Sequence, residues 1–169
     1  MTKHKAFISH YHADDDDVKK FVDYFCEEKG VFTPKIVGDD YDTTINSDDS
    51  DYIMRKIRED YLTDSTVTIV LIGKETANRK YVDWEIASTI RNDKNNKRSG
   101  LIGIYLEGQS NSEIPPRLQD NVDTGYAKVY SYPSYSPSTL DKWIDEAYER
   151  RNDDSYVVNN TRELFQRNR

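Results

Sequence analysis

The stretch from Ser65 to Ile72, which reads Ser-Thr-Val-Thr-Ile-Val-Leu-Ile, is the clearest strand signal in the chain. It is β-branched and nearly continuously apolar, and Gly73 follows it directly. A run of this kind is typical of a parallel strand that helices cover on both faces. The stretch therefore predicts an α/β fold built on a parallel sheet.

Shorter strand and helix signals alternate on either side of this strand. This alternation favours a flavodoxin-like three-layer sandwich, with five mostly parallel strands in the order 2-1-3-4-5. Residues 107–125 are expected to form a long loop. The other strands are predicted at 5–9, 32–37, 101–106 and 127–132, and helices at 14–28, 48–62, 81–91 and 138–151, with Ser47 or Asp48 and Ser136 or Ser138 as caps.

Length and composition fit one domain over 1–151, followed over 152–169 by a polar tail or a short helix that packs on it through Leu164 and Phe165. The net charge of −7 argues against binding to nucleic acid through phosphate attraction. No apolar run approaches the roughly 20 residues that cross a bilayer, and the N-terminal run is too short for a secretion signal. The single cysteine, Cys26, falls among apolar residues and excludes a disulfide framework. We therefore expect a cytoplasmic protein.

The strand order also predicts where a ligand binds. In open parallel sheets, ligands bind beyond the C-terminal ends of the strands, at the point where the direction of winding reverses. For this order, that point lies between the strands at 5–9 and 65–72. The topology places five polar residues near one pocket: Ser9, His10, Asp48, Ser50 and Glu85.

Glu85 is the residue among these that most needs an explanation. It lies in the stretch Arg79–Ile86, and no lysine or arginine stands three or four positions away from it. The usual explanation of a helical glutamate, an ion pair one turn away, therefore does not apply. Asp83 does have such a neighbour, because Lys80 lies three positions before it. This contrast favours a functional role for Glu85.

Two other acidic groups have simpler explanations. The run Asp14–Asp17 complements the dipole at a helix N-terminus, so we expect no metal site there. Asp39, Asp40 and Asp42 invite comparison with phosphoacceptor receiver domains, which share this fold. Receivers need an acidic pair after the first strand, and this chain has Ser9-His10 at that place.

The order of motifs resembles that of TIR domains. Their first motif is an apolar strand that ends in Ile-Ser-Tyr or similar, and Lys5–Tyr11 reads Lys-Ala-Phe-Ile-Ser-His-Tyr. Over roughly residues 3–107 the chain is similar to the TIR-like family of the bacterial Thoeris anti-phage system, the ThsB family. The similarity is carried further by the strand 68–73, Thr76, Arg79, Tyr81-Val82 and Trp84-Glu85-Ile86.

The resemblance implies a TIR enzyme that cleaves NAD, with Glu85 as its catalytic residue and NAD as substrate rather than cofactor. In Thoeris systems the TIR protein responds to a phage-derived trigger and makes a cyclic ADP-ribose-type signal, which activates a separate effector. TIR enzymes often work as assemblies, which implies a homo-oligomer. No metal is implied. The candidates for binding NAD are Ser9, His10, Tyr11, Ser47, Asp48, Ser50, Arg79 and Trp84.

One carboxylate is sufficient for this reaction. Nicotinamide leaves NAD as a neutral molecule and needs no general acid. Positive charge builds on the ribose in the transition state, as in glycosidases, and a buried carboxylate stabilises that charge. For cyclisation, a ring nitrogen or hydroxyl of the same ADP-ribose attacks in place of water, and Tyr11 or Trp84 would help to exclude water.

Two other functions remain open on the sequence alone. A non-catalytic TIR-like interaction module is favoured by the apolar-poor second strand, and by the loop after it, which lacks a recognisable TIR pattern. A nucleoside deoxyribosyltransferase also uses a carboxylate on a similar sheet, but the first-strand motif matches TIR domains better. Nucleotide products of wild type and Glu85→Gln separate the enzyme from the interaction module.

Overall fold

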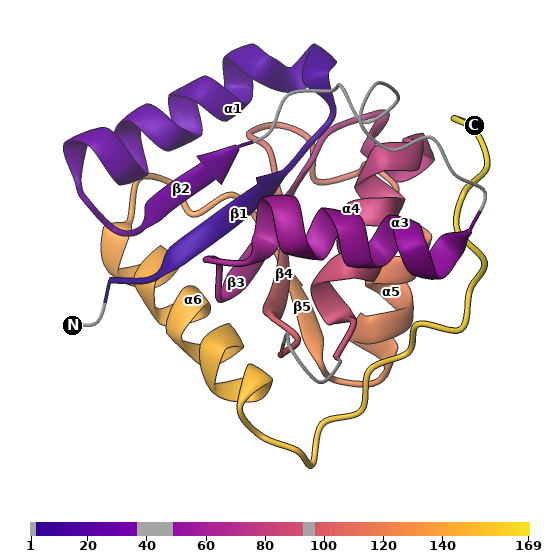
Figure 1. Cartoon of the computed structure of the whole chain (residues 1–169). Coiled ribbons are helices and arrows are strands. Elements are labelled where there is room, and N and C mark those ends of the chain that lie inside the picture. Colours follow the sequence, from indigo (N-terminus) through magenta and orange to yellow (C-terminus); the bar gives the residue numbers. More distant parts are fainter. Residues whose placement is uncertain (1–2, 37–48, 93–96) are drawn as a thin grey trace.

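The computed structural model describes residues 3–36, 49–92 and 97–169 and contains one five-stranded parallel sheet (Figure 1). The strand order, β2-β1-β3-β4-β5, is the order predicted from the sequence, and every pairing is parallel. The α/β fold is thereby confirmed. The strands are β1 (Lys5–Ser9), β2 (Thr33–Ile36), β3 (Val67–Ile72), β4 (Gly100–Tyr105) and β5 (Ala127–Tyr130).

Helices cover both faces of the sheet and complete three layers (Figure 1). Helices α1 and α6 pack on one face, and α3, α4 and α5 pack on the other. Both α1 and α3 continue into π-helical segments, at Asp23–Glu28 and Arg58–Leu62. The α-helices are α1 (Asp15–Val22), α3 (Ser50–Ile57), α4 (Lys80–Ile90), α5 (Pro116–Asp123) and α6 (Pro137–Arg151), and short 3-10 turns lie at His12–Asp14 and Thr76–Asn78.

Strand β3 is the centre of the core. All six of its residues are buried. Val67, Ile69 and Leu71 belong to the apolar cluster under α1 and α6, whereas Val70 and Ile72 belong to the cluster under α4 and α5. Because successive side chains point to opposite faces, burial of every residue requires cover on both sides. The structure thus confirms the reading of this stretch as a doubly covered strand.

The prediction of a long loop over 107–125 is wrong, because this stretch contains α5. Pro115-Pro116 reads as a helix breaker, but Pro116 stands at the first position of the helix, where proline needs no hydrogen bond. Leu118 is fully buried against the sheet, and this apolar contact stabilises a short helix whose sequence is mostly polar.

Two further boundaries differ from the expectation. Helix α3 is capped by Asp49, whose Oδ1 accepts hydrogen bonds from the backbone of Asp51 and Tyr52, whereas the sequence suggested Ser47 or Asp48. Both of those residues, and the acidic loop at 39–46, lie outside the described residues. The tail after α6 forms no helix over 152–169.

Cys26 lies in the core cluster under α1, as its apolar neighbours indicated. Burial raises the pKa of its thiol to about 12. At pH 8 the thiolate fraction is then only about 10⁻⁴, so we expect iodoacetamide to label the folded protein at least ~100-fold more slowly than the urea-unfolded protein. Mass spectrometry of the labelled chain checks this, and rapid stoichiometric labelling of the folded protein would contradict it.

Candidate active site

The C-terminal ends of β1 and β3 form the point at which the winding of the sheet reverses. Strand β1 connects onward to β2 on one side, whereas β3 connects to β4 on the other. Ser9 is the last residue of β1 and lies beside Val70 of β3 in the sheet. Helix α4 begins shortly after β3 ends, so its first turns face this edge. Sheets of this class bind ligands at such a reversal.

Ser9 and Glu85 meet at this edge. The Ser9 hydroxyl donates a hydrogen bond of 2.7 Å to Oε1 of Glu85. Ser9 is fully buried, and Glu85 is only 6% exposed. A buried carboxylate that accepts from a hydroxyl keeps its acceptor oxygens in a fixed direction and is shielded from bulk water. The two residues that strand order alone brought together are thus in direct contact, although they are 76 positions apart.

The position of Glu85 is fixed by the packing of α4 against β3. The Thr89 hydroxyl donates to the backbone oxygen of Glu85 at 2.8 Å. Thr68 of β3 approaches the same Thr89 hydroxyl at 2.8 Å. Because Thr89 has one hydroxyl hydrogen, Thr68 must be the donor in that contact. This chain of hydrogen bonds ties the backbone of α4 at Glu85 to the central strand.

Tyr11 and Arg79 also meet, at the loops that follow β1 and β3. The Arg79 guanidinium lies over the Tyr11 ring, 4.2 Å from its centroid. Such a cation–π contact holds the two side chains together but does not neutralise the charge of the guanidinium. His10 instead faces the start of α1, where its Nε2 lies 2.8 Å from Oδ1 of Asp15. The sequence predicted His10 in the ligand pocket, whereas in the structure its ring contacts Asp15 of α1.

Asp14 is a second carboxylate at this edge, although its sequence context predicts only a role at the helix terminus. Its Oδ2 is buried and has no hydrogen-bond partner among the described residues. A Cβ at Gly73 would lie 2.4 Å from that oxygen, so the close approach requires glycine after β3. Burial, followed by the charge of Asp17, raises the pKa of the Asp14 carboxyl. Only the contact with Gly73, which is distant in sequence, could have indicated this environment.

Asp83 does not depend on Lys80 as the sequence suggested. Instead it forms a buried pair with Arg117 of α5, in which Nε and Nη2 donate to the two carboxylate oxygens at 2.9 and 3.3 Å. The Lys80 ammonium lies over the rings of Tyr81 and Trp84. The long-range partner prevails because a buried carboxylate needs a buried cation, and Lys80 remains at the edge of the helix.

Two further candidates, Trp84 and Ser50, take no part in the Ser9–Glu85 hydrogen bond. Trp84 is buried, and its Nε1 donates to the backbone oxygen of Phe165 at 2.9 Å. Ser50 is exposed at the start of α3, and the next residue, Asp51, pairs with Arg91 beyond the end of α4. Arg91 is six positions past Glu85, or about 9 Å along a helix axis.

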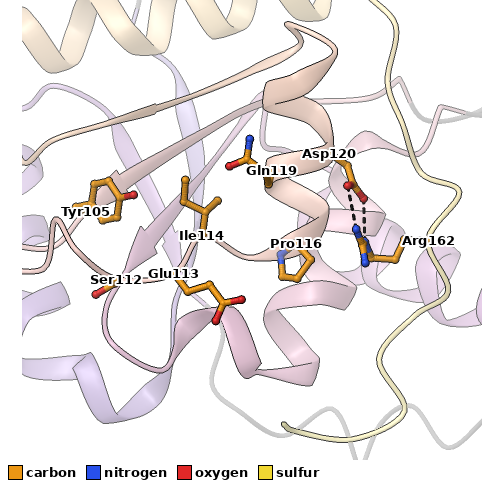
Figure 2. Close-up of a pocket in the computed structure, with 8 residues that line it drawn as sticks. All are labelled: Tyr105, Ser112, Glu113, Ile114, Pro116, Gln119, Asp120 and Arg162. Atoms are coloured by element: carbon orange, nitrogen blue, oxygen red, sulfur yellow. Dashed lines mark hydrogen bonds and ion pairs between the residues drawn. The ribbon is translucent and has the colours of Figure 1, made fainter.

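A cavity of about 440 Å³ lies beyond the end of β4, beside α5 (Figure 2). Glu113 and the ion pair between Asp120 and Arg162 border it, and Arg162 comes from the tail. None of its eight lining residues is one that the sequence predicts for the site. The Ser9–Glu85 contact, at the strand ends where sheets of this class bind ligands, is therefore a better candidate for the active site than this cavity.

In the ranges 3–36, 49–92 and 97–169, no three histidine, cysteine or acidic side chains gather closely enough to hold a metal ion. Among the helices of these same ranges, none has both the length and the apolar content that spanning a membrane requires.

A five-stranded parallel sheet in the order 2-1-3-4-5, flanked by helices, is consistent with a TIR-like fold. A family model described as "Thoeris protein ThsB, TIR-like domain" matches residues 7–111. That match covers more than half of the chain, and the chain therefore belongs to the ThsB TIR-like family of Thoeris systems. A search among curated proteins finds no match. The matched region includes Ser9 and Glu85 and ends before α5.

Proposed function

We propose that this protein cleaves NAD in the cytoplasm and converts it to a cyclic ADP-ribose-type nucleotide during anti-phage defence. The observation that carries the proposal is the buried hydrogen bond between Ser9 and Glu85 at the reversal point of the sheet. Membership of the Thoeris family supports the biological setting. In this proposal a phage-derived trigger starts synthesis, and the nucleotide diffuses to a separate effector.

The reaction begins with cleavage of the bond between C1′ of the ribose and the nitrogen of nicotinamide. The bonding electrons go to that nitrogen, so the charged ring leaves as neutral nicotinamide. The ribose becomes cation-like, and the Glu85 carboxylate stabilises the charge that develops on it. Ser9 acts as a positioning residue, because its hydroxyl holds one oxygen of the Glu85 carboxylate in place.

The second step forms a bond between C1′ and a nucleophile. In cyclisation, a ring nitrogen or a hydroxyl of the same ADP-ribose attacks C1′, and a hydroxyl would release its proton on attack. Attack by water would give linear ADP-ribose instead, so the site must exclude water. Tyr11 and Arg79 border the same strand ends, and the guanidinium offers a charge for the pyrophosphate.

The proposal is tested by incubating the purified protein with NAD, with and without an extract of phage-infected cells, followed by mass spectrometry of the nucleotides. We expect nicotinamide to be released together with an equal amount of an ADP-ribose-type product whose mass equals that of ADP-ribose less one water. Intact NAD in both incubations, at protein concentrations high enough for self-association, would contradict the proposal.

A further inference from the structure

The C-terminal segment, residues 159–169, lies along α5 and α4 without forming a helix (Figure 1). Its first contact is reciprocal: the side-chain amide of Asn121 donates to the backbone oxygen of Asn159, and the Asn159 N–H donates to Oδ1 of Asn121. Asn121 belongs to α5 and is fully buried. This two-bond contact fixes the register in which the segment begins to follow the helices.

Arg117 joins the middle of the segment to α4. Its guanidinium is 1% exposed and donates to Asp83, to Oδ1 of Asn160 at 2.8 Å and to the backbone oxygen of Glu163 at 3.1 Å. The backbone N–H of Phe165 donates to the same carboxylate of Asp83 at 2.9 Å. Asp83 is two positions before Glu85 on the same helix. This buried network therefore fixes α4 at a point close to the candidate catalytic residue.

The end of the segment closes on the first turn of α4. Arg79, at the N-cap position of α4, makes no side-chain capping bond. The backbone N–H of Lys80 donates to Oδ1 of Asn168 at 2.8 Å, across 88 positions of sequence. The Arg169 N–H donates to the backbone oxygen of Asn78 at 2.8 Å. Asn168 therefore acts as the helix cap that the local sequence lacks.

We infer that the C-terminal segment positions the helix that carries Glu85, with Asn168 and Arg117 as positioning residues. The inference rests on the proposed function for its catalytic part. Within the first five residues of α4, Lys80 contacts Asn168, Asp83 contacts Arg117, and Trp84 contacts Phe165. All three partners lie beyond the family match, which ends at residue 111. The matched region, residues 7–111, therefore contains the packing of α4 on β3 but not these three partners of its first turns.

The test uses Asn168→Ala in the full chain, with Arg167→Ala as the matched control and Asn168→Asp as the conservative rescue. Arg167 is exposed and makes no hydrogen bond or ion pair with any residue in the described ranges. An aspartate keeps an oxygen for the Lys80 N–H and adds a charge that suits a helix N-terminus. Hydrogen exchange of the first turn of α4 and the kcat and KM of nicotinamide release are measured for each variant.

We expect Asn168→Ala to speed exchange in the first turn of α4 by about 2–30-fold, as loss of a helix cap implies. We expect its kcat to fall by about 3–30-fold with KM changed less than about twofold, because the carboxylate is misplaced while NAD still binds. Arg167→Ala and Asn168→Asp should match wild type in both measurements.

Each other outcome has a separate meaning. Unchanged exchange in Asn168→Ala would overturn the inference that the segment holds α4. Faster exchange with unchanged kcat would overturn its positioning role and leave only a structural one. A wild-type protein that releases no nicotinamide, while exchange responds as expected, would overturn the proposed function and the catalytic part of the inference with it.

Discussion

Glu85→Gln is expected to lower the rate of nicotinamide release by about 100–1,000-fold, the usual cost of losing one preorganised charged group. Glutamine has nearly the same shape and keeps an oxygen that can accept from the Ser9 hydroxyl, so the fold should be retained. The measurement is the initial rate of release from NAD in the presence of infected-cell extract. The melting temperature of the variant, within a few degrees of wild type, confirms that charge alone was removed.

Glu113→Gln is the matched control for this substitution. Glu113 is a carboxylate that borders the cavity beside α5, and neither Ser9 nor Glu85 lines that cavity (Figure 2). The proposal predicts an unchanged rate for Glu113→Gln. Equal rates for wild type and Glu85→Gln, or a large loss in Glu113→Gln alone, would contradict the assignment of Glu85. Full phage protection by Glu85→Ala in cells would favour the non-catalytic interaction module instead.

Arg117→Met is expected to lower the free energy of unfolding by roughly 3–5 kcal/mol, because it leaves the Asp83 charge buried without its cation. The substitution also removes the hydrogen bonds to Asn160 and to the backbone of Glu163. For a chain of this size the loss corresponds to a decrease in melting temperature of roughly 6–20 °C. Urea unfolding and thermal denaturation measure both quantities.

Arg162→Met provides the comparison, because Arg162 makes a similar two-bond pair with Asp120 in which the two side chains are 41% and 19% exposed, against 1% and 3% for the pair of Arg117 and Asp83. Exposed pairs contribute about 0–1 kcal/mol, so its melting temperature should change by at most a few degrees. If both variants lost the same stability, the buried Asp83–Arg117 pair would not hold α4 more strongly than a surface pair, and the role given to Arg117 would be contradicted.

The fold was predictable because its core depends on local patterns. The apolar run of β3 and the alternation of strands with helices are both visible along the sequence, and together they define the sheet order. Helix α5 was missed because its sequence is mostly polar and starts with Pro115-Pro116. Its stability comes from burying Leu118 and Arg117 against distant elements, which no local pattern records.

In the candidate site, too, some contacts could be predicted from the sequence and others could not. The contact between Ser9 and Glu85 follows from strand order, which brings the ends of β1 and β3 together. The pairing of Asp83 with Arg117 and the close approach of Asp14 to Gly73 depend on tertiary packing. Local spacing predicted Lys80 as the ion-pair partner of Asp83, but Asp83 pairs with a buried cation elsewhere in the chain. The role of the tail was invisible for the same reason, since its contacts span about half of the chain.

The most direct test of the account is a crystal structure of the Glu85→Gln protein with NAD bound. The variant should bind NAD and consume it about 100–1,000-fold more slowly than wild type. We expect the ribose next to nicotinamide to lie against position 85, within hydrogen-bond distance of its side chain, with the pyrophosphate towards Arg79. NAD bound in the cavity beside α5, or with that ribose pointing away from position 85, would contradict the central claim that Glu85 stabilises the ribose cation.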